Sequence, residues 1–175
     1  MKRISLIWVL GLLALVTAGF AEAYEKMVFG VVEKVTLLPE NIVLSSKLDT
    51  GAKTSSLGAV DIKAVEENGE KWIEFTVKAK KDEFRLRKKL IGYARIKIRD
   101  VERIFGGFKK TYVSRPVVLM KVKLGDREAL IKVNLTDRHH FNYPFLLGRD
   151  AIAALGGIVD PAKAFVVGKS KASSK

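Results

Sequence analysis

The tripeptide Asp49-Thr50-Gly51 has the residue types that a carboxylate-dependent hydrolase needs. It follows an apolar stretch ending at Leu48, so the acid stands at the end of an expected strand. A carboxylate activates water at a peptide carbonyl when a second carboxyl about 3 Å away shares one proton with it, because such a pair cannot both ionise. Gly51 lacks a side chain, so backbone N–H groups can approach and stabilise the acid. Asp49 is therefore the candidate catalytic residue.

This loop occurs once in the 175 residues, so a second acid has to come from a symmetric partner. A twofold dimer supplies it, since each subunit contributes the same surface and the same acid. Thr50 is suited to tie one loop to its twin, and Ala52 is small enough for a crowded centre. The homodimer is thus a requirement of this mechanism.

A second segment, Phe145-Leu146-Leu147-Gly148-Arg149, is expected to pack beneath the loop. A short helical pattern follows it over 150–155 and stops at Gly156-Gly157. We expect Leu147 and Gly148 to support the Asp49 loop. Asp, Thr and Gly are also ordinary turn residues, so the joint presence of both segments favours catalysis over a simple turn.

The elements that must position these residues are mostly strands. The turn signal Asn68-Gly69 predicts a hairpin. Expected strands cover 28–37, 42–44 leading into 47–48, 59–65, 72–77, 96–98, 118–124, 129–135, 158–161 and 165–167. Many short strands and one short C-terminal helix predict an all-β fold closed into a barrel.

The N-terminus predicts export. Lys2 and Arg3 precede an apolar run to Phe20, and small residues at 21–23 form a cleavage site. We expect a signal peptide over 1–23, cleaved near Ala23, with a retained N-terminal anchor as the alternative. Export without any cysteine points to the bacterial periplasm. The remainder predicts one domain over 24–167 and a disordered basic tail over 168–175.

Positive charge is concentrated in one segment. Between Lys78 and Arg115 the chain has 14 Lys or Arg residues and four acidic ones. Lys88 and Lys89 belong to a run that we expect to lie between strands and to attract acidic peptides or anionic envelope components. The alternative is a solvated surface. We expect no nucleic-acid partner, because the aromatic residues form no RNA-binding motif and the chain is exported.

The joint pattern resembles the retropepsin class of aspartic peptidases. More narrowly, the chain resembles the bacterial retropepsin-like family often labelled "ATP-dependent zinc protease". The resemblance extends from about residue 28 to 167, and the segments that carry it are 47–57, 135–138, 144–149 and 159–161. The resemblance implies a closed barrel, a catalytic Asp49 and an Asp/Asp dyad across a homodimer. It also implies that Thr54, Arg138 and Arg149 line or support the site. Where the family usually has a His after the Ser-Leu pair, this chain has Gly58.

The resemblance suggests acidic peptides as substrates, since members of the family are similar to partners of ATP-grasp ligases that add acidic residues to peptides. The zinc and ATP of the label have no support in the residues. His139 and His140 are the two histidines, and as neighbours on a strand they would point to opposite faces. No Gly-rich phosphate loop is present. We therefore expect no cofactor and no metal.

Arg138 and Arg149 are each expected to pair with a carboxylate such as Asp137 or Asp150, or with substrate. The sequence thus favours an exported homodimeric aspartic endopeptidase that hydrolyses acidic peptides. The alternative is a non-catalytic envelope module on the same barrel. It would bind anionic polymers or acidic peptides through the basic segment, and Asp49 would merely cap a turn.

Overall fold

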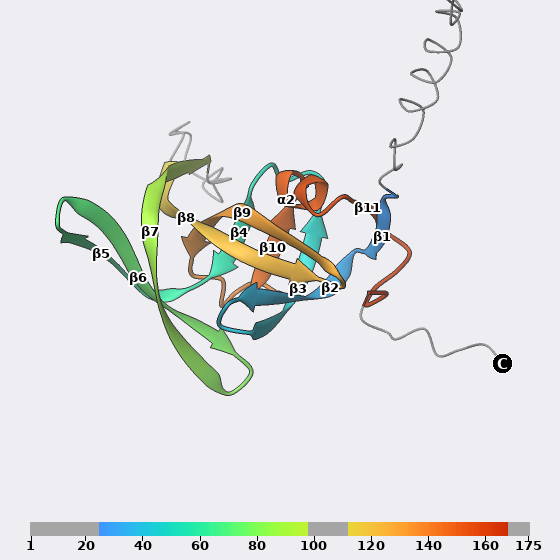
Figure 1. Ribbon diagram of the computed structural model, residues 1–175, viewed down its shortest axis with the longest axis horizontal. Helices are drawn as coiled ribbons and strands as arrows, with labels where there is room; N and C mark the ends of the chain where they lie inside the picture. Colours follow the sequence, from blue (N-terminus) through green and yellow to red (C-terminus); the bar gives the residue numbers. More distant parts are fainter. Residues whose placement is uncertain (1–24, 98–111, 168–175) are drawn as a thin grey trace, which may run out of the picture.

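The computed structural model describes residues 25–97 and 112–167 (Figure 1). The expected signal peptide, the expected tail and part of the basic segment lie outside these residues. The elements are β1 (Met27–Gly30), β2 (Val32–Leu38), β3 (Ile42–Asp49), β4 (Ser55–Gly58), β5 (Val60–Glu67), β6 (Glu70–Ala79), β7 (Asp82–Lys97), β8 (Tyr112–Leu124), β9 (Arg127–Thr136), β10 (Phe145–Gly148), α2 (Arg149–Ala154) and β11 (Gly157–Asp160). Within the described ranges, no helix is both long and apolar enough to cross a membrane.

Six strands form a closed barrel, as the sequence predicts. Their hydrogen-bonded order is β2-β3-β10-β4-β9-β8, and pairing of β2 with β8 closes the ring. Alternate residues of these strands point inward, and the core they form includes Leu48, Leu57, Val133 and Leu147, each at most 2% exposed. Helix α2 covers one end of the barrel through Ala151 and Ile152. Burial of this apolar surface is the main stabilising contribution.

The short strand β10 lies between β3 and β4, and this insertion builds the site. It runs parallel to β3, with Gly148 opposite Asp49, and antiparallel to β4, with Leu146 opposite Ser56. Segments almost a hundred residues apart in the sequence are therefore hydrogen-bonded neighbours. The predicted packing of the second segment against the Asp49 loop is confirmed.

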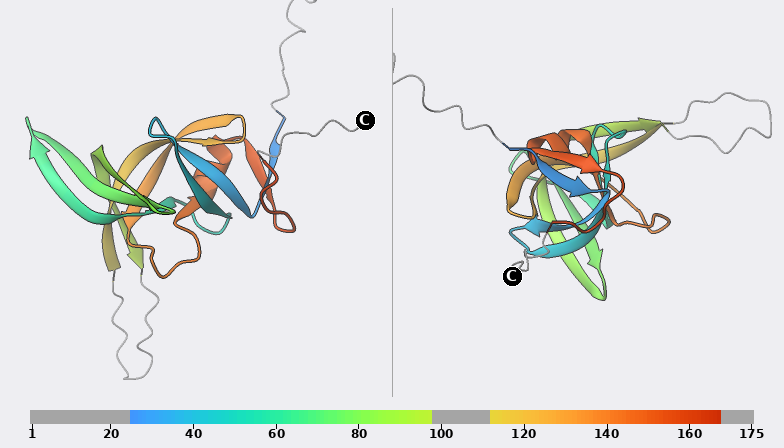
Figure 2. Two further views of the ribbon diagram at one scale, coloured as in Figure 1. Left: turned by 90° about the horizontal axis from the view of Figure 1, so that it is seen from below. Right: turned by 90° about the vertical axis from the view of Figure 1, so that its right-hand side faces the viewer.

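Strands β5, β6 and β7 extend the sheet beyond the barrel as an arm, which projects at the opposite end from β1 and β11 (Figures 1 and 2). The first half of β7 pairs with β6 and its second half with β8. The hairpin around Asn68-Gly69 is confirmed, with both residues at positive φ.

The expectation that the basic run between Lys80 and Lys89 is a loop is wrong, because most of it belongs to β7. Leu86 is buried, whereas Arg85 and Arg87 on either side are exposed. This alternation is that of a strand with one solvated face. In the sequence this alternation is not apparent, because most of its residues are charged.

The expected first strand, 28–37, is divided at Val31, whose N–H donates to the carbonyl of Lys163 at 2.7 Å. Before this point β1 pairs in parallel with β11, away from the barrel. The expected strand 165–167 is also wrong. The N–H of Phe165 donates to the carbonyl of Val32 at 2.7 Å, but those of Val166 and Val167 donate to the carboxylate of Glu33, at 3.0 and 3.3 Å. The segment therefore forms no strand ladder.

Candidate active site

The carboxylate of Asp49 is held by its own loop at the end of β3. Its Oδ1 accepts hydrogen bonds from the N–H groups of Gly51, at 3.0 Å, and Ala52, at 3.2 Å. Leu48 anchors the strand in the core, and alternation along β3 turns Asp49 outward, where it is half-buried. Within residues 25–97 and 112–167, no group donates to Oδ2. One oxygen therefore fixes the side chain, and the other is available for chemistry.

The loop rests on Gly148 and on the start of α2. A β-carbon at Gly148 would lie 2.7 Å from the carbonyl carbon and oxygen of Thr54, so only glycine fits without a backbone shift. The N–H of Arg149 donates to the carbonyl of Ala52 at 2.9 Å, and that of Asp150 donates to the carbonyl of Lys53 at 3.3 Å. The first N–H groups of a helix have no partner inside the helix, so here they hold the loop.

Ser55 and Asn134 complete this support. The Ser55 hydroxyl accepts a hydrogen bond from the N–H of Gly148 at 3.2 Å, and the Asn134 amide donates to the Ser55 carbonyl at 2.6 Å. Both side chains are buried. Neither residue is among those predicted from the sequence. The signal that could have identified them is the placement of polar residues inside otherwise apolar strand patterns.

Thr50 and Gly51 form the exposed tip of the loop, whereas Ala52 is half-buried. A tip that projects to solvent in a single chain is free to meet an identical loop. The dimer itself remains a prediction at this point.

A hollow lies directly beside Asp49. Its wall includes Arg138, whose guanidinium Nε donates to the carbonyl of Tyr143 at 3.2 Å and whose Cζ lies 4.2 Å from the centre of the Phe141 ring. The lining residues are Val31, Val32, Lys47, Asp49, Arg138, Phe141, Asn142, Tyr143 and Leu146. Within the described part of the chain Arg138 forms no ion pair, so its expected pairing with Asp137 or Asp150 is wrong, whereas its expected contact with substrate stays a prediction. Burial lowers the pKa of Arg138, and the nearby charge of Arg115 lowers it further.

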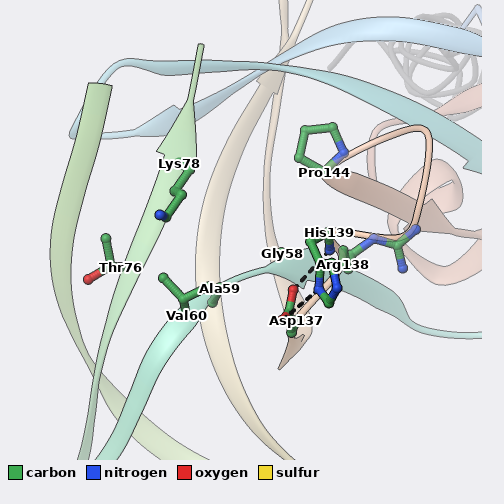
Figure 3. Close-up of a pocket in the computed structure, with 9 residues that line it drawn as sticks. All are labelled: Gly58, Ala59, Val60, Thr76, Lys78, Asp137, Arg138, His139 and Pro144. Carbon is green, nitrogen blue, oxygen red and sulfur yellow. Dashed lines mark hydrogen bonds and ion pairs between the residues drawn. The ribbon is translucent and has the colours of Figure 1, made fainter. Parts of the chain in front are cut away.

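A second hollow adjoins the first through Arg138 (Figure 3). Lys78 and Thr76 approach it from β6, and Arg138 turns away from the Asp137–His139 pair. Gly58 lines this hollow and donates its N–H to the carbonyl of Pro144 at 2.7 Å. A β-carbon at Gly58 would lie 3.0 Å from the Pro144 oxygen. The loop after β9 thus occupies the space that a larger residue at position 58 would need.

The other predicted substrate-binding residues lie apart from this hollow. Thr54 and Arg149 are exposed, and the described residues include no ion-pair partner for Arg149. Lys88 forms an ion pair with Glu40 at 2.7 Å, and Lys89 forms one with Glu70. Contact of any of these with substrate stays a prediction.

The two histidines are expected on a strand, but they lie in a turn after β9. Their ring centroids are 3.5 Å apart, and His139 Nδ1 lies 2.8 Å from Asp137 Oδ2. Within the ranges that the structure describes, no group of three or more His, Cys, Asp or Glu side chains is arranged to hold a metal ion.

Comparison with known proteins agrees with this geometry. Residues 28–170 match the family described as "RimB-like: Retropepsin-like aspartic endopeptidase RimB". A solved structure from Legionella pneumophila subsp. pneumophila str. Philadelphia 1, the protein Lpg0085 of unknown function, is 43% identical and superposes with a TM-score of 0.67. That alignment covers 81% of this chain and 98% of the other.

Curated relatives have a different printed name. A "Probable alpha-L-glutamate ligase" from Shewanella halifaxensis is 31% identical over 130 residues, and one from Shewanella pealeana is 30% identical over the same length. Each alignment covers 72% of this chain, which spans about a quarter (26%) of the length of those relatives. The family match covers most of the chain, including both segments of the site. The chain therefore belongs to the RimB-like family of retropepsin-like aspartic endopeptidases.

Proposed function

We propose that this protein is an aspartic endopeptidase whose catalytic centre consists of Asp49 from each of two identical subunits. The observation that carries the proposal is the seating of the Asp49 loop on Gly148, with the carboxylate turned outward and fixed through Oδ1 alone. A loop that served only as a turn would not need the close backbone contact with Thr54 or the two N–H groups of α2. The family membership supports the same chemistry.

The reaction follows from two carboxyls that share one proton. The ionised Asp49 takes a proton from water, whose oxygen attacks the carbon of the peptide carbonyl. The protonated Asp49 of the other subunit donates its proton to the carbonyl oxygen. The amine nitrogen is then protonated by the first carboxyl, the second recovers its proton from the hydroxyl, and the C–N bond breaks. The dyad returns to its starting state.

We propose acidic peptides as the substrates. The matched relatives carry the name glutamate ligase, and this chain corresponds to about a quarter of their length, so a ligase and a domain of this type occur together in one polypeptide there. A formal net charge of +13 favours approach of a polyanionic chain. We also propose export to the periplasm, which rests on residues 1–23 of the sequence.

The test of catalysis is Asp49→Asn. The amide oxygen of Asn can still accept the hydrogen bonds from Gly51 and Ala52, so we expect the fold and the dimer to persist. Loss of the ionisable group removes the base, and we expect cleavage of a fluorescence-quenched glutamate-rich peptide to fall by at least about 1,000-fold. Asp82→Asn, at the exposed first residue of β7 in the arm, is the matched control. An Asp49→Asn protein with wild-type cleavage refutes the proposal.

The alternative is a binding module without catalysis. The basic face of β7 favours it, because Arg85, Arg87 and Lys89 are exposed along one strand. Pairing of Arg87 and Lys89 with Glu67 and Glu70 weakens it, since paired charges attract a polyanion less. If the module is correct, reversing Lys88 and Lys89 to Glu abolishes binding of polyglutamate, whereas Asp49→Asn has no effect on any function of the protein.

A further inference from the structure

A row of side chains that includes several polar ones crosses the outer face of the barrel beside Asp49. Directly paired residues on neighbouring strands point to the same face. This row crosses β3, β10, β4, β9 and β8. Its residues, each paired with the next, are Lys47, Leu146, Ser56, Asn134 and Val117. Asp49 follows Lys47 by two residues, and Arg115 precedes Val117 by two. Both thus lie on this same outer face.

Within the part of the chain that the structure describes, two polar atoms of residues on this face are buried without a hydrogen-bond partner. They are the hydroxyl oxygen of Ser56 and the guanidinium Nε of Arg115. Ser56 is only 6% exposed, and a buried hydroxyl without a hydrogen bond is unfavourable, so a group that hydrogen-bonds to it would be stabilised. Among the described residues Arg115 makes one long hydrogen bond, from Nη1 to the amide oxygen of Asn134 at 3.4 Å. That amide is fixed in turn by its bond to the Ser55 carbonyl, so Asn134 positions Arg115.

Arg138, in the loop after β9, adds a buried guanidinium to the half-buried one of Arg115. It is 8% exposed and is held in place by the Tyr143 carbonyl and the Phe141 ring. Arg115 is close enough for its charge to lower the pKa of Arg138, and burial lowers the pKa of both. Within the described residues no carboxylate lies within ion-pair distance of either. Two like charges that are partly removed from water repel, and a carboxylate between them relieves that repulsion.

We propose that Arg115, Arg138 and Ser56 form a subsite that binds a carboxylate of the peptide, beside the Asp49 centre. The two guanidinium groups and the Ser56 hydroxyl are donors, and a carboxylate accepts several hydrogen bonds at once. The carboxylate comes from a glutamate side chain or from the C-terminus of the peptide. The subsite determines specificity, and its effect on cleavage rests on the proposed function. Binding does not depend on catalysis.

Binding to the inactive Asp49→Asn protein tests the subsite separately from catalysis. The probes are hexaglutamate amide, hexaglutamine amide and hexaglutamine with a free C-terminus, and the measurement is calorimetry. We expect one of the two carboxylate-bearing peptides to bind at least about 10-fold more tightly than hexaglutamine amide, given the strength of charged hydrogen bonds. A preference for hexaglutamate amide identifies the side chain as the source, and a preference for the free acid identifies the C-terminus.

Arg115→Gln, made in the same Asp49→Asn background, should reduce that preference by about 10- to 100-fold and leave hexaglutamine amide within about threefold of its starting affinity. Arg95→Gln is the matched control. Its neighbour Ala94 pairs with Arg115, so Arg95 lies on the opposite face of the same sheet and stacks on Tyr112. Removal of this charge should leave the preference unchanged. An equal loss in both variants shows a general charge effect and overturns the proposal.

Ser56→Ala is a second test that leaves the fold intact. It removes a hydroxyl that has no hydrogen bond to any residue that the structure describes, so the melting temperature should not fall. The carboxylate preference should nevertheless fall by about three- to 10-fold. If the active wild-type enzyme cleaves glutamate peptides but neither variant alters the preference, the subsite is wrong and the peptidase stands. If both variants abolish the preference but the wild type cleaves nothing, the subsite stands and the peptidase fails.

Discussion

Replacement of Gly148 by alanine places a methyl group against the loop that carries Asp49. The new β-carbon would lie 2.7 Å from the carbonyl carbon and oxygen of Thr54 and 2.8 Å from the carbonyl oxygen of Lys53. Ordinary contacts begin at 3.4 Å, so the loop backbone must withdraw by about 0.7 Å. These atoms belong to the backbone and cannot rotate away as a side chain would.

The expected cost is that of overpacking, about 1–3 kcal/mol in the free energy of unfolding. For a domain of this size, that corresponds to a fall in melting temperature of roughly 3–9 °C. A loop shift of this size also displaces the Asp49 carboxylate. Since a misplacement of about 1 Å can cost about 100-fold in rate, we expect kcat for peptide cleavage to fall by about 10- to 100-fold.

The assay combines thermal unfolding with steady-state cleavage of a quenched glutamate-rich peptide. Gly69→Ala is the control, because Gly69 has φ of +76° and a β-carbon there would have no atom within 4 Å. It should cost about 1 kcal/mol through backbone strain and leave kcat unchanged. A Gly148→Ala enzyme with wild-type kcat would show that this contact does not position the acid.

Two further predictions concern acids outside the dyad. Glu33→Gln should lower the free energy of unfolding by about 1.5–3 kcal/mol in urea titrations. The buried carboxylate accepts hydrogen bonds from the N–H groups of Gly30 and of 166–167, whereas an amide can turn a donor toward them. An unchanged urea midpoint contradicts this. The N–H and side chain of His139 lower the pKa of Asp137 below 3.8. The stabilisation that results is present above the unfolded pKa and is lost as the pH falls through the lower folded pKa. The melting temperatures of wild type and Asp137→Asn should therefore converge in acid. A difference that stays constant with pH contradicts this.

The sequence predicts the barrel and the core of the site because both depend on local patterns. Alternating apolar residues specify the strands, and a glycine in the second segment indicates a position where another stretch of backbone approaches closely. The pairing of Gly148 with Asp49 follows from these two patterns together. The family resemblance extends the same reasoning over most of the chain and is confirmed by the family match.

The parts that could not be predicted depend on side chains that meet across strands. Ser56, Asn134 and Arg115 come from three strands, and register alone brings them onto one face. The segment 165–167 has the apolar composition of a strand, yet the distant carboxylate of Glu33 takes its N–H groups. The basic run has the composition of a loop because its many charges obscure the alternation of a strand.

The central claim is that one catalytic centre requires Asp49 from both subunits. Mixing wild-type and Asp49→Asn subunits at a constant total concentration, after exchange has reached equilibrium, tests it directly. If a mixed dimer is inactive, peptide cleavage falls with the square of the wild-type fraction, to about one quarter at an equal mixture. A linear decline, to about one half, would mean that each subunit works alone and would contradict the shared dyad.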